Sequence, residues 1–362
     1  MNINLILGLA AIAAISSCLL TFPAKWLGRR LDILDFPGHR SSHQNPTPRT
    51  GGLAIFFSIM VCLVAMLLLA QPRPSIEVVL ELAGLTFVLA ALGFLDDIFS
   101  LPPSVRFLVQ MVVAAAAAWL FGGTHLFGAG GSGETLFWAA WAFSTLFIVA
   151  FVNFFNFMDG INGIAAFQGT IGASAICCFV LTFGGNVLTA AMAAVLAGAC
   201  AGFLPHNFPK AGVFMGDGGS MVLGFLLALL GLKAAGESNL PWIGMVLPLG
   251  IFIYDPIFTL FKRLKRHENL VQAHREHHYQ LLIRSGWSHA RVTLLQGVLM
   301  ILCSAGGAAY IVGGTEVRLA VIGGLLVTAV VYSVLVHRHF TRKTAASGSK
   351  PQASGAAADA NR

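Results

Sequence analysis

Long apolar runs alternate with short polar connections over the 362 residues of the chain. A membrane-spanning helix needs about 20 mostly apolar residues, and eleven runs come close to that length. The predicted spans cover residues 3–22, 52–70, 76–95, 105–121, 136–153, 163–183, 186–204, 215–232, 241–261, 291–312 and 317–337. We therefore predict an all-α, polytopic integral membrane protein, because helices satisfy their own backbone hydrogen bonds in lipid.

Composition and charge support this class and add an orientation. The chain is 57% hydrophobic and 10% charged, whereas soluble domains are about 25% charged. The net charge of +7 indicates contact with anionic lipid head groups of the bilayer rather than with nucleic acid. Nearly all Lys and Arg residues follow odd-numbered spans or lie in the tail; the exceptions are Arg73, Lys233 and Arg318. The positive-inside rule then predicts a periplasmic amino terminus and a cytoplasmic carboxyl terminus.

One polar break, between the fifth and sixth spans, is the richest in candidate chemistry. Asn153, Asn156, Asp159 and Gly163 are three or four residues apart, so they would share one helix face. Polar groups are costly in hydrocarbon unless they are satisfied, which indicates a water-facing site. A helix cap is the alternative, since Asn and Asp also satisfy backbone amides at helix ends.

Two earlier connections carry further candidates. Arg40, His43 and Arg49 could hold a phosphorylated ligand, because Arg offers a bidentate fork to phosphate oxygens; an anchor for lipid head groups is the alternative. Asp96 and Asp97 are adjacent, and such a pair near a membrane boundary requires a cation, a hydrogen-bond donor or a raised pKa. A divalent ion, proton transfer or a simple helix stop would each explain them.

The connection before the eighth span ends in Gly216-Asp217-Gly-Gly-Ser220. A glycine turn that enters a helix presents backbone amides to phosphate, and Asp217 could hold Mg²⁺ beside it. A capped, glycine-rich helix start is the alternative. Ser220 supplies a hydroxyl to the same turn.

The last long connection is rich in histidine: His274, Arg275, His277 and His278 lie within five residues. They could bind phosphate or a metal, or transfer protons near neutral pH, although a solvated basic loop would look similar. Asp255, late in the ninth span, is more readily a satisfied structural carboxylate than part of a cation pocket.

The alternation of spans places all five polar clusters on the cytoplasmic face. Carboxylates, a phosphate-type turn, Arg and His on one face favour Mg²⁺-assisted phosphoryl transfer between a nucleotide and a lipid. A secondary transporter is a rival hypothesis, but transporters place polar groups near the middle of the membrane and show repeated halves. A non-catalytic scaffold is another, and it would not need four separate aspartates.

At these residues the chain resembles the polyprenyl-phosphate N-acetylhexosamine-1-phosphate transferase superfamily. The shared motifs follow one order through nearly the whole chain: PTPRTGG, the Asp-Asp pair, NxxNxxDGxxG, Asn207 ahead of GDxGS, and the His-rich loop. The resemblance implies transfer of a sugar-1-phosphate from a UDP-N-acetylhexosamine to undecaprenyl phosphate, with release of UMP. A single step and a path through an aspartyl intermediate both remain open.

The resemblance also implies roles for individual residues. The expected catalytic residues are Asp96, Asp97, Asp159, His277 and His278. The expected Mg²⁺ ligands are Asp217 and Asp159, with Mn²⁺ as a candidate substitute. The expected substrate-binding residues are His43, Arg49, Asn153, Asn156, Asn162, Asn207, Gly216, Ser220, His274 and Arg275. Two departures stand out: Asn162 replaces an Asp common in the family, and HREHHYQ is looser than the family's His cluster.

Within the superfamily, Arg49 and the HREHHYQ loop resemble the branch that initiates O-antigen and related surface polysaccharides, with the peptidoglycan-precursor branch as the alternative. The expected location is the bacterial cytoplasmic membrane. The expected organisation is one transferase domain over residues 1–340, with active-site loops at 23–52, 96–104, 153–163, 205–220 and 262–291, and a disordered cytoplasmic tail at 341–362. The oligomeric state stays open, a homodimer included.

Overall fold

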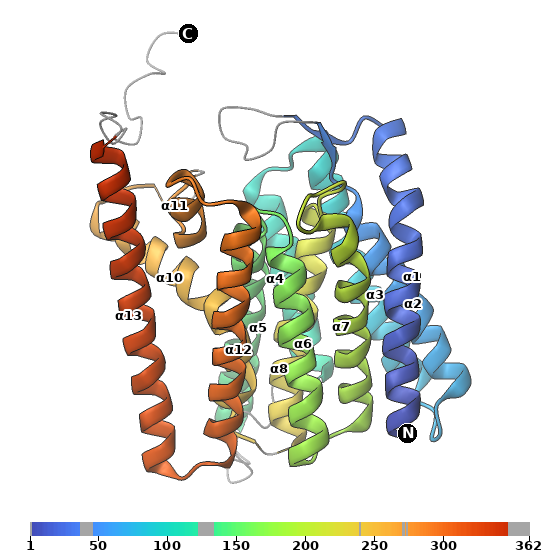
Figure 1. The fold of residues 1–362 in the computed structure, drawn as a ribbon. Coiled ribbons are helices and arrows are strands. Elements are labelled where there is room, and N and C mark those ends of the chain that lie inside the picture. The colour runs from blue at the N-terminus through green and yellow to red at the C-terminus, as the bar shows by residue number, and fades with distance from the viewer. Residues whose placement is uncertain are drawn as a thin grey trace.

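The computed structural model describes residues 2–36, 46–121, 134–238, 240–269, 272 and 274–346. These residues form a bundle of helices with one small pair of strands (Figure 1). The helices are α1 (Ile3–Arg30), α2 (Gly51–Leu69), α3 (Ile76–Phe99), α4 (Pro103–Phe121), α5 (Glu134–Met158), α6 (Ile164–Phe183), α7 (Val187–Asn207), α8 (Asp217–Ser238), α9 (Trp242–Val246), η2 (Leu247–Leu249), α10 (Gly250–Lys265), α11 (His278–Arg284), α12 (His289–Val312) and α13 (Thr315–Ala346). The strands are β1 (Leu34–Asp35) and β2 (Thr47–Pro48).

The described residues contain eleven segments that are long and apolar enough to cross a membrane, with α9, η2 and α10 counted as one segment. The predicted fold class and number of spans are thereby confirmed. Helix α1 begins at one end of the bundle and α13 ends at the other (Figure 1), as an odd number of spans requires. The assignment of those ends to periplasm and cytoplasm remains a prediction.

Helix α8 is the centre of the bundle, and 89% of its most apolar 18-residue segment is buried. It contacts the six helices from α2 to α7 and also α9. Its first residue is Asp217, so the most enclosed helix begins at a predicted site residue. By contrast, only 17% of the most apolar 18-residue segment of α13 is buried, and this helix packs on α11 and α12 at the edge of the bundle.

Several predicted boundaries were wrong because helices run past the apolar segments. Helix α1 continues to Arg30 and contains Pro23, so the predicted loop 23–52 begins eight residues later. Asp96 and Asp97 lie in the last turn of α3 rather than in a loop. A helix can continue past the membrane boundary through polar residues. Hydropathy gives the length of the apolar segment, which can be shorter than the helix.

The carboxyl-terminal part also differs from the predicted loops. The ninth span is broken at η2, where Pro248 lacks an amide hydrogen for the helix ladder and its carbonyl accepts from Gln168 Nε2 at 3.0 Å. A short helix, α11, lies within the predicted loop 262–291. The predicted tail 341–362 is helical as far as Ala346, and its residues 347–362 lie outside the described part of the chain.

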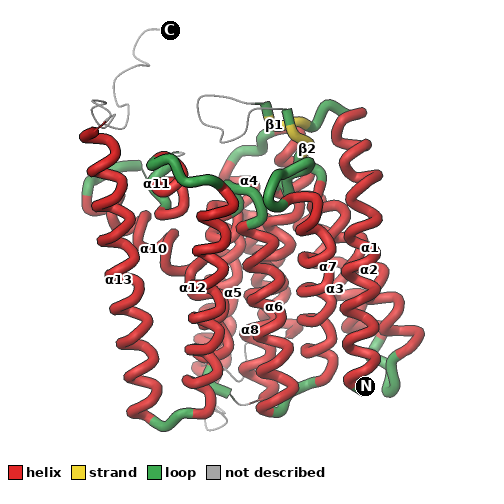
Figure 2. The backbone as a smooth tube through the Cα atoms, viewed as in Figure 1, coloured by secondary structure: helices red, strands yellow, loops and turns green. Residues whose placement is uncertain are grey.

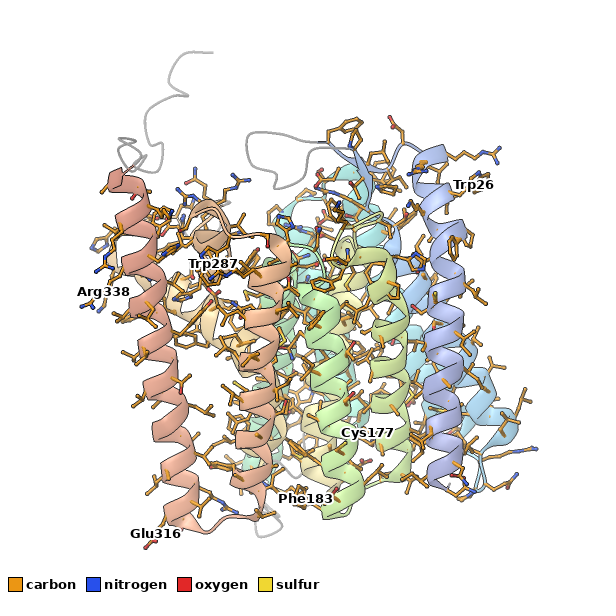
Figure 3. The ribbon with its side chains drawn as sticks, viewed as in Figure 1. Trp26, Cys177, Phe183, Trp287, Glu316 and Arg338 are labelled. Carbon is orange, nitrogen blue, oxygen red and sulfur yellow. The ribbon has the colours of Figure 1, made fainter. Side chains whose placement is uncertain are left out.

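Strands β1 and β2 form an antiparallel pair, with Leu34 opposite Pro48 and Asp35 opposite Thr47. The pair lies at the end of the bundle where α1 and α13 finish (Figure 2). Trp26, Trp287 and Arg338 lie toward that same end, whereas Phe183 and Glu316 lie at the opposite end (Figure 3). The strand end of the bundle is also where the site residues gather.

Candidate active site

A polar cleft of about 240 Å³ opens at the strand end of the bundle. Its walls are formed by Asp35, Arg49, Asp97, Asn156, Asp159, Gly160, Ile161, Asn162, Asn207, Phe214, Gly216, Asp217 and His289. Eight of these were predicted as site residues from the sequence: Arg49, Asp97, Asn156, Asp159, Asn162, Asn207, Gly216 and Asp217. Four predicted clusters, far apart in the sequence, therefore meet in one place.

The crossing of α3 and α8 brings two carboxylates together. Asp97 Oδ2 accepts hydrogen bonds from the backbone amides of Asp217 at 2.8 Å and Gly218 at 3.3 Å. The next two amides donate to the carbonyl of Gly216. In this structure a carboxylate and a carbonyl therefore accept from all four amides, and the phosphate-binding role of the turn stays a prediction.

The end of α5 fixes the side chain of Asp217 from another direction. Asn156 Nδ2 donates to Asp217 Oδ1 at 2.9 Å and to Ser220 Oγ at 3.0 Å. Ser220 is fully buried and lies behind the cleft wall. Asn153, one turn earlier, donates to Gln110 Oε1 at 2.7 Å and to the Val149 carbonyl, so it ties α5 to α4.

The break after α5 is held by contacts on both sides. The amide of Gly163, whose φ is +80°, donates to Asn207 Oδ1 at 2.7 Å, and Asn207 Nδ2 donates to the Val213 carbonyl at 2.9 Å. Asn162 donates its side-chain amide to the Pro209 carbonyl. Asn207 therefore braces the cleft wall, in addition to any substrate contact predicted for it.

Gly216 closes the turn beside the cleft. Its φ is +74°, a conformation that favours glycine, and a Cβ atom there would lie 2.1 Å from the Arg49 carbonyl oxygen and 2.6 Å from Asp97 Oδ2. The backbone amides of Gly51 and Gly52 donate to the carbonyls of Phe214 and Met215. The first loop and the turn before α8 are thus joined backbone to backbone.

Charge is concentrated but only partly compensated in the cleft. Arg49 pairs with Asp35, and Arg106 Nη1 lies 3.6 Å from Asp217 Oδ2. Burial, followed by the nearby charges of Asp217 and Asp97, raises the pKa of Asp159 well above its usual range. A carboxylate in such a place is stabilised by a proton or by a cation.

Asp96 faces away from its neighbour. It is 6% exposed, it pairs with Arg106, and Asp96 Oδ1 accepts from the amide of Leu101 at 2.7 Å. Adjacent residues on a helix point about 100° apart, so only Asp97 of the pair reaches the cleft wall. Arg106, which links Asp96 to Asp217, was not proposed from the sequence.

The His-rich loop lies beside the cleft and not in its wall. His277 and His278 are 2% and 0% exposed, and both contact the buried carboxylate of Asp255. Burial, with a smaller contribution from His277, lowers the pKa of His274 to about 4. The carbonyl of Arg275 accepts from Arg284 Nη1 at 3.0 Å.

In all, seven predicted site residues are described but lie outside the cleft wall: Asp96, Asn153, Ser220, His274, Arg275, His277 and His278. His43 lies outside the described residues. The catalytic and binding roles assigned to these residues remain predictions, and the structure gives most of them protein partners.

Of the other five wall residues, Gly160 belongs to the NxxNxxDGxxG motif, and four were missed: Asp35, Ile161, Phe214 and His289. Ile161 and Phe214 lie within the motifs named above, but their apolar side chains give no sequence signal of a binding site. His289, the first residue of α12, accepts a hydrogen bond from the Asn162 amide through Nδ1 at 3.3 Å. Its lone position in the sequence carried no signal that it would meet the break.

The fold and the cleft together define a multi-pass membrane protein with an acidic site at one end of its bundle. The chain is 32% identical over 357 residues to the decaprenyl-phosphate N-acetylglucosaminephosphotransferase of Mycobacterium tuberculosis (strain CDC 1551 / Oshkosh), covering 89% of this chain and 87% of that protein. The glycosyl transferase family 4 profile matches residues 79–235. The chain therefore belongs to the polyprenyl-phosphate N-acetylhexosamine-1-phosphate transferases.

Two further relatives are named for different transferred groups. A probable undecaprenyl-phosphate N-acetylglucosaminyl 1-phosphate transferase of Bacillus subtilis (strain 168) is 31% identical over 292 residues, covering 79% of this chain and 80% of that protein. A phospho-N-acetylmuramoyl-pentapeptide-transferase of Moorella thermoacetica is 29% identical over 286 residues, covering 72% and 83%. The relatives thus include both an N-acetylglucosaminyl 1-phosphate transferase and a phospho-N-acetylmuramoyl-pentapeptide-transferase.

Proposed function

We propose that this enzyme transfers an N-acetylhexosamine-1-phosphate from a UDP-sugar to undecaprenyl phosphate, on the cytoplasmic face of a bacterial inner membrane. The observation that carries the proposal is the convergence of Asp97, Asp159 and Asp217 with Arg49 on one cleft. The first donor to test is UDP-GlcNAc, because two of the relatives described above are named for N-acetylglucosamine. The product would initiate a surface polysaccharide such as an O-antigen.

The reaction requires one phosphorus–oxygen bond to form and another to break. A phosphate oxygen of the lipid attacks the β-phosphorus of the UDP-sugar, and the bond from that phosphorus to the bridging oxygen breaks. The bridging oxygen leaves with the electron pair as part of UMP. Because the attacking phosphate is already anionic at pH 7, a strong general base is not required for this step.

The residues of the cleft suit such a diphosphate. The guanidinium of Arg49 can donate to phosphate oxygens through its planar fork. The amide of Asn156 already fixes the Asp217 carboxylate at 2.9 Å, so that carboxylate is held before substrate arrives. His289 and Asn162, which line the cleft at the break, would orient the nucleoside or sugar part of the donor.

The donor set also fits Mg²⁺. Asp217 and Asp159 would hold the ion, because Mg²⁺ is commonly bound by one or two carboxylates together with substrate phosphates and water. Among the described residues, no three His, Cys, Asp or Glu side chains form a metal-ligand group of their own. Bound there, Mg²⁺ would supply positive charge that neutralises the diphosphate.

The proposal is tested with purified protein, undecaprenyl phosphate, Mg²⁺ and a panel of UDP-sugars. We expect UMP release that depends on both the lipid and an N-acetylhexosamine donor. UDP-N-acetylmuramoyl-pentapeptide belongs in the panel, since release with that donor alone would assign the chain to the peptidoglycan branch. No UMP with any donor, together with solute uptake in vesicles, would favour a transporter instead.

A further inference from the structure

Asp255 is a fully buried carboxylate on α10 that the proposed chemistry does not use. Its Oδ2 accepts from the backbone amide of His278 at 3.0 Å, and its Oδ1 lies 3.2 Å from His277 Nδ1 and 3.0 Å from His278 Nδ1. Thr259 also donates to Oδ1 at 3.2 Å. A buried charge is costly unless several donors satisfy it, so this cluster fixes its members tightly.

The amide that Asp255 binds belongs to the first residue of α11. Two glutamates of the same loop are also held on α10, because Arg263, which is 3% exposed, lies 3.2 Å from Glu268 and 3.6 Å from Glu276. On its other side, His278 Nε2 lies 2.7 Å from Ser333 Oγ of α13. The start of α11 is therefore held from α10 and α13 together.

The next residue, Tyr279, carries this placement to the cleft. Its hydroxyl donates to the carbonyl of Phe157 at 2.9 Å, close to the end of α5. A Cβ atom on Gly160 would lie 2.1 Å from that hydroxyl oxygen, so Tyr279 packs directly on the turn that follows Asp159. Gly160 itself lines the cleft.

We propose that Asp255 is a positioning residue: through α11 and Tyr279 it sets the turn that presents Asp159 to the cleft. The contacts form one chain from a buried carboxylate to the cleft wall, and each link is a direct hydrogen bond or a close packing contact. His277 and His278 are parts of this support. The expected effect on kcat rests on the transferase function proposed above, whereas the expected effect on the conformation of the turn after Asp159 does not.

The kinetic test compares Asp255→Ala and Asp255→Asn with the wild type in the UMP-release assay. Loss of a residue that orients a catalytic group typically lowers activity about 10- to 100-fold, so we expect kcat to fall by that factor in Asp255→Ala. The KM for the UDP-sugar should change less than about threefold. Asp255→Asn retains one acceptor for the His278 amide and should recover part of the loss.

A double-mutant cycle separates positioning from general destabilisation. If Asp255 acts through Tyr279, Asp255→Ala combined with Tyr279→Phe should be no slower than the slower single variant. If the two losses instead multiply, the proposed route through Tyr279 is wrong. Glu237→Gln is the matched control, because this carboxylate pairs with Lys233 and accepts from Thr189 near the opposite end of α8; it should keep wild-type kcat.

Hydrogen exchange supplies a readout that does not depend on turnover. In Asp255→Ala, we expect faster amide exchange in residues 278–284 and in residues 156–163, with unchanged exchange in α1 and a smaller change in Asp255→Asn. Protection of residues 156–163 equal to that of the wild type would overturn the positioning role of Asp255. If the wild type released no UMP with any donor, the transferase proposal would fail, and the exchange result would still decide the positioning role.

Discussion

Replacing Asp217 with Asn is the most direct test of the cleft, because the change removes one charge and almost no volume. The Asn156 amide, 2.9 Å from Asp217 Oδ1, can keep its hydrogen bond to the carbonyl oxygen of the new side chain. Turnover should nevertheless fall about 10³-fold, as expected when one preorganised electrostatic group is lost. That factor corresponds to about 4 kcal/mol of transition-state stabilisation.

Stability should change far less than turnover. The lost attraction is to Arg106, 3.6 Å away, and the two side chains are 30% and 29% exposed, so solvent limits its value to about 1 kcal/mol. The substitution also removes repulsion from Asp97 and Asp159, which line the same cleft. We therefore expect the melting temperature to stay within about 4 °C of the wild type.

Two measurements on the same detergent-purified sample check this reasoning: UMP release at saturating Mg²⁺ and thermal unfolding. Glu77→Gln, in the first turn of α3, is the control for loss of a carboxylate outside the cleft. Turnover of Asp217→Asn within tenfold of the wild type would refute the assignment of Asp217 as a metal ligand. A large fall in melting temperature would show instead that the carboxylate is structural.

Three further predictions concern the turn and the titration of the site. Gly216→Ala should lower both melting temperature and turnover, because a Cβ would collide with the Arg49 carbonyl and Asp97; a thermal scan with wild-type stability would contradict the close contact. Burial and neighbouring carboxylates raise the pKa of Asp159. Without a divalent cation, the contribution of Asp159 to folding stability is therefore complete below about pH 4 and is lost as the pH rises through the raised pKa. Scans across pH should show this decline, and Asp159→Asn or added Mg²⁺ should flatten it. Burial lowers the pKa of His274 to about 4, so its contribution is lost as pH falls from about 6.5 to about 4, and His274→Gln should reduce that acid sensitivity.

Hydropathy was sufficient for the spans, because burial in lipid imposes a length and a composition that the sequence displays directly. It was not sufficient for helix ends. Asp96 and Asp97 end an apolar run but continue α3 to Phe99, since polar residues near a membrane boundary can remain helical. The break at η2 was also hidden, because Pro248 is flanked by apolar residues on both sides within the predicted ninth span.

The membership of the cleft was predictable where a motif placed polar groups at helical spacing, as for Asn156 and Asp159. It was not predictable where tertiary contacts decide which way a polar group faces. Asn153 has the same spacing, yet it donates to Gln110 on α4. His289 shows the reverse case, because only the packing of α12 against the break brings it to the cleft.

The adjacent aspartates of α3 explain how the site keeps charge that a folded protein would ordinarily neutralise. Asp96 turns toward Arg106 and the Leu101 amide, so its charge is compensated by the protein itself. Asp97 turns toward the start of α8, where two amides compensate it only in part. Asp159 and Asp217 border the same cleft as Asp97. Because these like charges lie close together, the cleft favours binding of a proton or a cation. The fold thus places three carboxylates around one cleft at a cost in stability, and this supports the proposal that Mg²⁺ and a diphosphate complete the charge balance of the site.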